Sequence, residues 1–126
     1  MTFTKYQFNN YCYWPSNPKK IIEFIGGSYL ASKPDLAYKR FIKSLIDKNY
    51  AVHAYKYTPQ FDHQELAIRA WKDFKNCQRS LSKRIGTSIP SIRIGHSLGC
   101  KLHLISPDGG RTVSYTHLRA HETEAD

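Results

Sequence analysis

The sequence predicts one domain of the α/β class with a mostly parallel sheet, and three observations support this prediction. Short apolar runs typical of buried strands alternate with longer segments that have helical periodicity. Turn-forming residues, such as Pro15, Gly26-Gly27, Pro59 and Gly86, separate these runs. The chain has 126 residues and a globular composition, enough for one small domain with a core. Strands that alternate with helices indicate parallel pairing with right-handed crossovers.

An early strand or hairpin and three further strands are predicted before residue 95. Residues 2–13 carry closely spaced aromatic side chains and favour an early strand or hairpin. The run Ile21–Ile25 is typical of a buried strand and ends at Gly26-Gly27-Ser28. A second strand is expected over 50–57, with Val52 and Ala54 on one face, and a third over 91–94.

Two amphipathic helices are predicted between these strands. The first begins at Pro34, a residue favoured in a first helical turn, and ends near Asn49. The second begins at the capping-box-like pair Asp62 and Glu65 and ends at Gly86. Their core-facing residues follow helical spacing: Tyr38, Phe41, Ile42, Leu45 and Ile46 in the first, and Leu66, Ala70, Trp71, Phe74, Cys77, Leu81 and Ile85 in the second.

The run Gly95-His96-Ser97-Leu98-Gly99 directly follows the third strand and precedes a helix-compatible stretch, residues 98–104. It matches G-x-S-x-G, the nucleophile elbow of α/β-hydrolases, in which a sharp strand-to-helix turn presents a serine. Ser97 is therefore the predicted nucleophile, and the Leu98 amide at the helix N-terminus is a predicted oxyanion donor. A phosphate-binding loop is excluded because its glycine spacing, lysine and hydroxyl positions are not matched.

The segment Gly26-Gly27-Ser28 follows the carboxyl end of its strand, as Ser97 follows the carboxyl end of another. Ligands of parallel sheets lie outside the carboxyl ends of the strands. The two segments are therefore expected to share one edge of the sheet, with a crevice between them. A plain tight turn into the helix is the alternative for the glycine segment.

Three segments together resemble DUF1350, a family of α/β-hydrolase-like proteins of cyanobacteria and plant plastids. They are 24–28, 58–63 and 95–104, and the likeness runs from about Trp14 to Arg111. The resemblance implies a partial α/β-hydrolase-like three-layer sandwich, but it implies no established activity. It gives Ser97 the nucleophile position, and it puts Gly27 or Ser28 where α/β-hydrolases supply a second oxyanion amide.

No complete catalytic triad is found in this chain. In α/β-hydrolases an acid and a histidine follow the nucleophile in sequence. After Ser97 the candidates are His103, on the same helix, and Asp108, in a predicted turn. His53, His63 and His96 are interpreted as structural, solvated or pointing away from Ser97. We therefore expect the acid and base beyond position 112 of a longer parent, and no substantial hydrolase activity in this polypeptide.

Residues 1–111 are interpreted as the amino-terminal portion of one α/β-hydrolase-like domain, and 112–126 as a non-native tail. Residues 113–123 resemble a translated sequencing adapter. His117 and His121 have the helical spacing of a zinc pair, but Leu118 holds the place of the general base in the metalloprotease motif. No metal or cofactor is expected. Without further strands, the third strand is expected to become an exposed edge.

Charge, cysteine content and apolar runs indicate which binding partners and which cellular location to expect. The formal charge is +9, but the basic residues are spread along the predicted helices and no nucleic-acid motif accompanies them. Three widely spaced cysteines indicate reduced thiols. No signal peptide is recognised, and no apolar run reaches the ~20 residues that cross a bilayer. A cytoplasmic location is expected, with the plastid stroma as the alternative.

The leading hypothesis is a parent serine esterase, thioesterase or acyltransferase that acts on a small ester or thioester through Ser97. A non-catalytic binding or scaffold protein of the same fold is the first alternative. A basic protein that binds nucleic acid or anionic lipid is the second. The acyl group, leaving group, lid and oligomeric state are not predicted.

Overall fold

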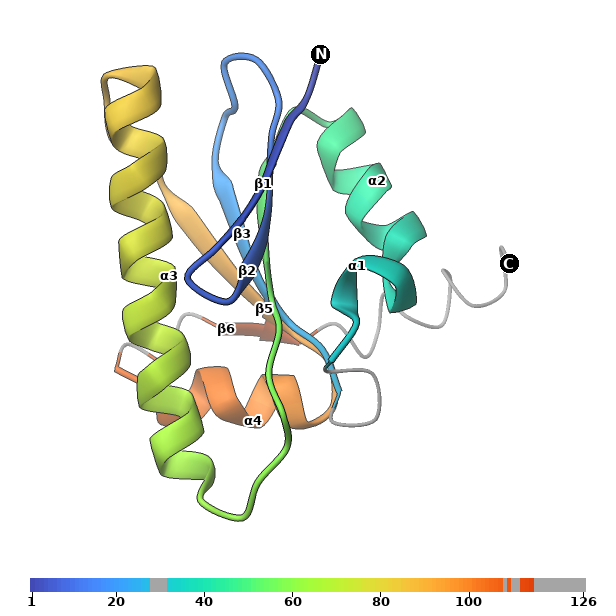
Figure 1. Ribbon diagram of the computed structural model, residues 1–126, viewed down its shortest axis with the longest axis vertical. Helices are drawn as coiled ribbons and strands as arrows, with labels where there is room; N and C mark the ends of the chain where they lie inside the picture. The colour runs from blue at the N-terminus through green and yellow to red at the C-terminus, as the bar shows by residue number, and fades with distance from the viewer. Residues whose placement is uncertain (28–31, 108, 110–111, 115–126) are drawn as a thin grey trace.

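The protein, represented by a computed structural model, is a three-layer α/β sandwich (Figure 1). The structure describes residues 1–27, 32–107, 109 and 112–114. A six-stranded sheet in the order β1-β2-β4-β3-β5-β6 forms the central layer. Helices α1 and α2 cover one face, and α3 and α4 cover the other. The predicted three-layer α/β sandwich is confirmed.

The antiparallel part of the sheet is the amino-terminal hairpin. Strands β1 (Phe3–Gln7) and β2 (Asn10–Trp14) pair with each other, and β2 also pairs antiparallel with β4. Phe8 and Asn9 connect them with φ angles of 49° and 58°. Two consecutive positive φ angles are typical of the two-residue turn that matches strand twist. The predicted hairpin is thus confirmed, and it makes the sheet mixed.

The parallel part contains β3 (Ile21–Ile25), β4 (Ala51–Tyr55), β5 (Ser91–Gly95) and β6 (Thr112–Ser114). Strand β3 lies between β4 and β5, and β5 also pairs with β6. The expectation that the third predicted strand would become an edge is therefore wrong. Residues 112–114 are extended and pair with Arg93, Ile94 and Gly95, which gives the end of β5 a neighbouring strand.

The first predicted helix is divided in two. Helix α1 (Pro34–Ala37) ends and α2 (Lys39–Asp47) begins at Tyr38, whose φ of −118° and ψ of 27° leave the helical region. The Tyr38 ring is buried against the backbone of Gly26, where an added Cβ would lie 2.3 Å from ring atom Cε2. Helical periodicity predicts which face is buried, but not this local break.

Helix α3 (His63–Ile85) has the ends that the sequence predicts. The Asp62 carboxylate accepts a hydrogen bond from the Glu65 amide at 3.0 Å, and Gly86 ends the helix with a φ of 80°. The capping pair is only half formed, because the Glu65 carboxylate binds Arg69 at 2.6 Å. Helix α4 (Leu98–Ile105) follows β5.

The core consists of two layers separated by the sheet. Ile22 and Phe24 of β3 face α2 with Val52 and Ala54, whereas Ile21 and Ile25 face α3 and α4. This alternation follows the two-residue period of a strand buried on both faces. Cys12 and Cys77 lie in the α3 layer as free thiols, with their sulfur atoms 3.8 Å apart.

Candidate active site

Ser97 lies at the turn between β5 and α4, the position that the motif predicts. Its φ of 58° and ψ of −124° fall in a region that residues with a side chain rarely adopt. Such a conformation costs on the order of 1–3 kcal/mol and persists where the surrounding structure enforces it. Ser97 is exposed, so its hydroxyl is accessible at the carboxyl edge of the sheet.

Gly95 and Gly99 leave the space that this turn needs. A Cβ on Gly95 would lie 2.4 Å from the Cα of Cys100, and a Cβ on Gly99 would lie 1.9 Å from the carbonyl oxygen of Ile25. Both contacts are with backbone atoms, which cannot rotate away. The two motif glycines therefore bring α4 close to the ends of β5 and β3.

The amino terminus of α4 provides a candidate oxyanion donor. The Gly99 and Cys100 amides donate to the carbonyls of His96 and Ser97, each at 3.0 Å. Within the part of the chain that the structure describes, no group accepts a hydrogen bond from the Leu98 amide. A first-turn amide of this kind can bind an anionic oxygen beside Ser97.

The glycine pair at the end of β3 lies beside Ser97. A Cβ on Gly27 would lie 3.2 Å from the Cβ of Ser97, and the His96 amide donates to the Ile25 carbonyl at 3.0 Å. The expected common edge is thus present. The Gly27 amide, however, donates to the Tyr38 hydroxyl at 2.9 Å, and Ser28 lies outside the described residues.

Two tyrosine hydroxyls, which the sequence did not predict, form hydrogen bonds with this glycine pair. Tyr38 Oη accepts a hydrogen bond from the Gly27 amide and shares a 2.8 Å hydrogen bond with His96 Nδ1. Tyr57 Oη donates to the Gly26 carbonyl at 2.8 Å, and burial raises the Tyr57 pKa. The only sequence signal was that Tyr38 lies on the predicted core face. These contacts join the glycine pair to His96, the residue that precedes Ser97.

The other histidines of the described residues lie apart from the Ser97 hydroxyl. His53 is buried in β4 and accepts a hydrogen bond from Trp14 Nε1 at 2.9 Å, while His63 lies 3.0 Å from the Lys101 ammonium. His103 is buried in α4, where its Nε2 donates to the Glu23 carbonyl at 2.9 Å. Burial lowers the pKa of His53 to about 3. Burial and the Arg93 charge lower the pKa of His103 to about 3.

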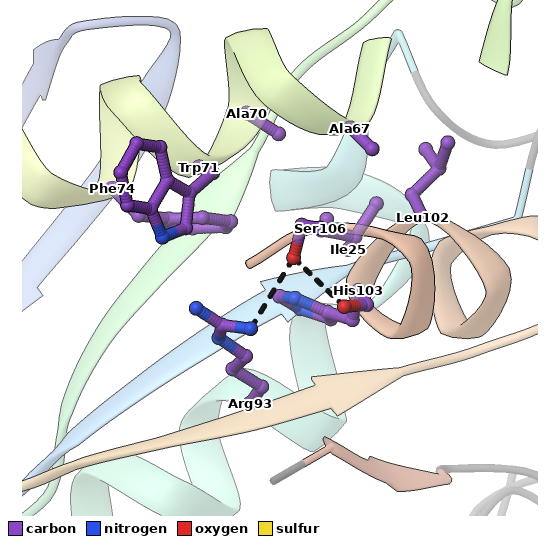
Figure 2. Close-up of a pocket in the computed structure, with 9 residues that line it drawn as sticks. All are labelled: Ile25, Ala67, Ala70, Trp71, Phe74, Arg93, Leu102, His103 and Ser106. Carbon is purple, nitrogen blue, oxygen red and sulfur yellow. Dashed lines mark hydrogen bonds between the residues drawn. The ribbon is translucent and has the colours of Figure 1, made fainter. Parts of the chain in front are cut away.

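A small hollow between α3, α4 and the sheet contains some of these groups (Figure 2). Arg93 donates to the Ser106 hydroxyl at 3.2 Å, and Ser106 donates to the His103 carbonyl at 2.8 Å. The hollow is too narrow for a water molecule. These polar groups bind one another and tie the end of α4 to β5, which is a structural role.

The described residues contain neither a metal-binding cluster nor a membrane-spanning helix. Among residues 1–27, 32–107, 109 and 112–114, no three His, Cys, Asp or Glu side chains are grouped as a metal site requires. His117, His121 and Asp108 lie outside those residues. No helix of the described chain is both long and apolar enough to cross a bilayer.

Comparison with known proteins identifies a family and a fold. The family described as "Protein of unknown function (DUF1350)" matches residues 5–109. No curated protein matches the chain. Carboxyl esterase 2 from the fungus Tuber melanosporum has a similar structure, with a TM-score of 0.62, 16% identity, and coverage of 83% of this chain and 38% of the esterase.

Two further solved structures are similar. For TT1662 from Thermus thermophilus the TM-score is 0.56 with 13% identity, over 83% of this chain and 51% of that one. For a highly thermostable carboxyl esterase from Bacillus coagulans the TM-score is 0.55 with 14% identity, over 82% of this chain and 38% of that one. The chain therefore spans between 38% and 51% of the length of these structures. At these identities the likeness establishes the α/β-hydrolase fold alone.

Proposed function

The chain belongs to the DUF1350 family, and from this membership and its α/β-hydrolase fold we propose that it is part of a serine hydrolase or acyltransferase acting on an ester or thioester. The observation that carries the proposal is the backbone of Ser97, with φ 58° and ψ −124° at the β5–α4 turn. A strained serine held between two obligatory glycines is the arrangement of a nucleophile elbow.

In the proposed reaction, Ser97 Oγ attacks the substrate carbonyl carbon while a base removes its proton. The carbonyl oxygen becomes an oxyanion that accepts a hydrogen bond from the Leu98 amide. The Gly27 amide now donates its hydrogen bond to Tyr38 Oη. It can be a second oxyanion donor only if that bond breaks, because one N–H cannot make two full hydrogen bonds. Ser28 is the other proposed donor. When the intermediate collapses, the base returns the proton to the leaving group, which departs as an alcohol or thiol. The acyl group stays on Ser97 until water or a second acceptor attacks it.

The proposed base and acid belong to a longer parent, beyond position 112. His103 donates to the Glu23 carbonyl inside the core, and His96 Nδ1 binds Tyr38. Neither arrangement supports proton removal from Ser97. We therefore propose that the present polypeptide has no substantial hydrolase activity, since loss of a base costs several orders of magnitude in rate, on the order of 10⁶.

The test compares this polypeptide with the proposed longer parent from the same organism, called the uninterrupted protein below. Hydrolysis of p-nitrophenyl butyrate and of an acyl thioester is measured for both. The proposal expects turnover by the uninterrupted protein alone, abolished in Ser97→Ala and retained in Ser88→Ala, which removes an exposed hydroxyl from the loop before β5. Turnover that survives Ser97→Ala would refute it.

A non-catalytic scaffold of the same fold remains the competing proposal. It is distinguished by the sequence beyond position 112, where an acid followed by a histidine favours the enzyme. For the parent we propose a small-molecule substrate rather than nucleic acid, and a location in the cytoplasm or the plastid stroma.

A further inference from the structure

The described part of the chain contains three notable hollows, which differ in position. The hollow of Figure 2 is buried and closed to water. One of about 860 Å³ lies between Phe3, Trp14 and Arg84. Because Trp14 ends β2, which runs antiparallel to β4, that hollow lies at the amino edge of the parallel strands, opposite Ser97. The third, of about 300 Å³, involves Tyr6, Lys56 and Arg69.

The third hollow opens at the same edge of the sheet as Ser97. Strand register aligns Gln7, Asn10, Tyr55, Ile25 and Gly95 in one row across the sheet. The hairpin turn, the segment 56–60, the glycine pair and Ser97 all follow this row. The Lys56 amide donates to the Asn9 carbonyl at 2.8 Å, which joins the hairpin turn to that segment.

Tyr57 connects the third hollow to the glycine pair beside Ser97. It contributes to the wall of the hollow, and its hydroxyl donates to the Gly26 carbonyl at 2.8 Å. The next residue is Gly27, where an added Cβ would lie 3.2 Å from the Cβ of Ser97. Strands β5, β3 and β4 are neighbours, so the carboxyl ends of β5 and β4 lie two interstrand spacings apart, about 10 Å.

The groups around the third hollow favour an anion. Lys56 and Arg69 supply two cations, and Thr58 and Gln60 supply hydrogen-bond donors. The Lys56 ammonium lies 5.8 Å from the centre of the Tyr6 ring, which holds the cation near the opening. Among the residues that the structure describes, none with a carboxylate lines this hollow.

Two acidic residues lie near these cations, and both have partners. Glu65 binds one nitrogen of Arg69, and a guanidinium retains further donors when one is engaged. Asp73 accepts hydrogen bonds from Asn9 and from the Tyr55 hydroxyl, at 3.0 and 2.9 Å. Lys56 has no acidic partner among the described residues.

We infer that this hollow is a substrate subsite that binds a phosphate or carboxylate group, at the same edge of the sheet as Ser97. The substrate class is thus narrowed to esters or thioesters that carry an anionic group at the far end. This inference rests on the proposed function only where it assigns the ester or thioester to Ser97. Anion binding by Lys56 and Arg69 does not require a reactive serine.

The test is an NMR titration of the isotope-labelled chain with glycerol 3-phosphate, butyrate and glycerol. The first two probes separate phosphate from carboxylate recognition, and glycerol is the neutral control. We expect saturable amide shifts within residues 56–60 for at least one anion and none for glycerol. The double variant Lys56→Gln/Arg69→Gln should raise Kd at least tenfold.

Lys43→Gln is the matched control. Lys43 is an exposed cation paired with Asp47 four residues on, as Arg69 is paired with Glu65, but it lies on α2. It should leave Kd unchanged. Shifts spread over all basic surfaces, or a Kd unchanged in the double variant, would overturn the inference.

Ser97→Ala separates this inference from the proposed function. It should bind the anion as the original chain does. Anion binding that persists while the uninterrupted protein shows no esterase activity would overturn the proposed function alone. Esterase activity without anion binding would overturn the subsite alone.

Discussion

Two of this chain's turns with a positive φ angle differ, because Gly86 has no side chain at that position and Ser97 has one. Gly86 ends α3 with a φ of 80°, and an added Cβ there would meet nothing within 4 Å. Glycine is used for its conformational freedom. At Ser97 the φ is 58°, but the residue has a side chain, and the glycines occupy positions 95 and 99, where space is short.

The difference supports the proposal that the Ser97 hydroxyl has a function. A turn that only ends a helix takes glycine at the strained position and avoids the cost. The turn at Ser97 keeps a polar side chain at that position and removes the side chains around it instead. Strain retained at an exposed, reactive group is a feature of functional sites. Four experiments test this comparison.

The largest effect is expected for Gly99→Ala. The new Cβ would lie 1.9 Å from the Ile25 carbonyl oxygen, so α4 would have to move away from β3. We expect a loss of about 4 kcal/mol or more in unfolding free energy, as for severe overpacking against backbone. Gly86→Ala, with open space, should cost only about 1–2 kcal/mol from its φ. Urea unfolding measures both, and equal losses would contradict the comparison.

The second effect is acid destabilisation through the packing that supports the Ser97 turn. His103 anchors α4 to β3, and His53 is buried in β4; both have a pKa of about 3. The unfolded pKa is about 6.5, so the unfolded chain binds these protons first. Stability should be complete above pH 6.5 and fall towards pH 3, by on the order of 2 kcal/mol per histidine by pH 4.5.

Urea unfolding at pH 7.5 and 4.5 measures this acid effect. The variant His103→Gln, which cannot become charged, should lose less stability between the two pH values than the original chain. An equal loss would mean that His103 is not buried in its neutral form.

The third effect concerns the support of the glycine pair. Tyr38→Phe leaves the buried Gly27 amide without its acceptor and should cost about 1–2 kcal/mol. Tyr57→Phe removes the donor to the Gly26 carbonyl and should cost a similar amount. Only Tyr38→Phe should alter the ring nitrogen chemical shifts of His96, because Tyr38 alone of the two binds it. Identical His96 spectra in both variants would contradict this arrangement.

The smallest effect is expected at Ser97 itself. Ser97→Gly should be about 1 kcal/mol more stable than Ser97→Ala, because glycine adopts the observed φ without strain but loses more entropy on folding. At an unstrained exposed position glycine would be the less stable of the two. Thermal unfolding of both variants measures the sign, and a more stable Ser97→Ala would show that the turn carries no strain.

Local patterns in the sequence predict most of the fold. The strand Ile21–Ile25, the ends of α3 at Asp62 and Gly86, and the turn before α4 follow from apolar runs, caps and glycine spacing. Each of these depends on residues close together in the chain. The glycines at 95 and 99 were predictable because a tight strand-to-helix turn needs space on both sides.

Contacts between distant residues could not be predicted. Tyr38 breaks the expected helix and reaches His96, 58 positions away, because its ring packs on Gly26; helical periodicity contains no such information. Pairing of β5 with β6 likewise depends on hydrogen bonds across the chain. The hollow at Lys56 and Arg69 depends on a hairpin register that no local pattern fixes.

The most direct test of the central claim is to treat the uninterrupted protein with a fluorophosphonate and map the modified residue by mass spectrometry. Our account predicts one rapid modification, on Ser97, with slow or no labelling of the present polypeptide. Rapid modification of another residue in the uninterrupted protein, with Ser97 unlabelled, would contradict it.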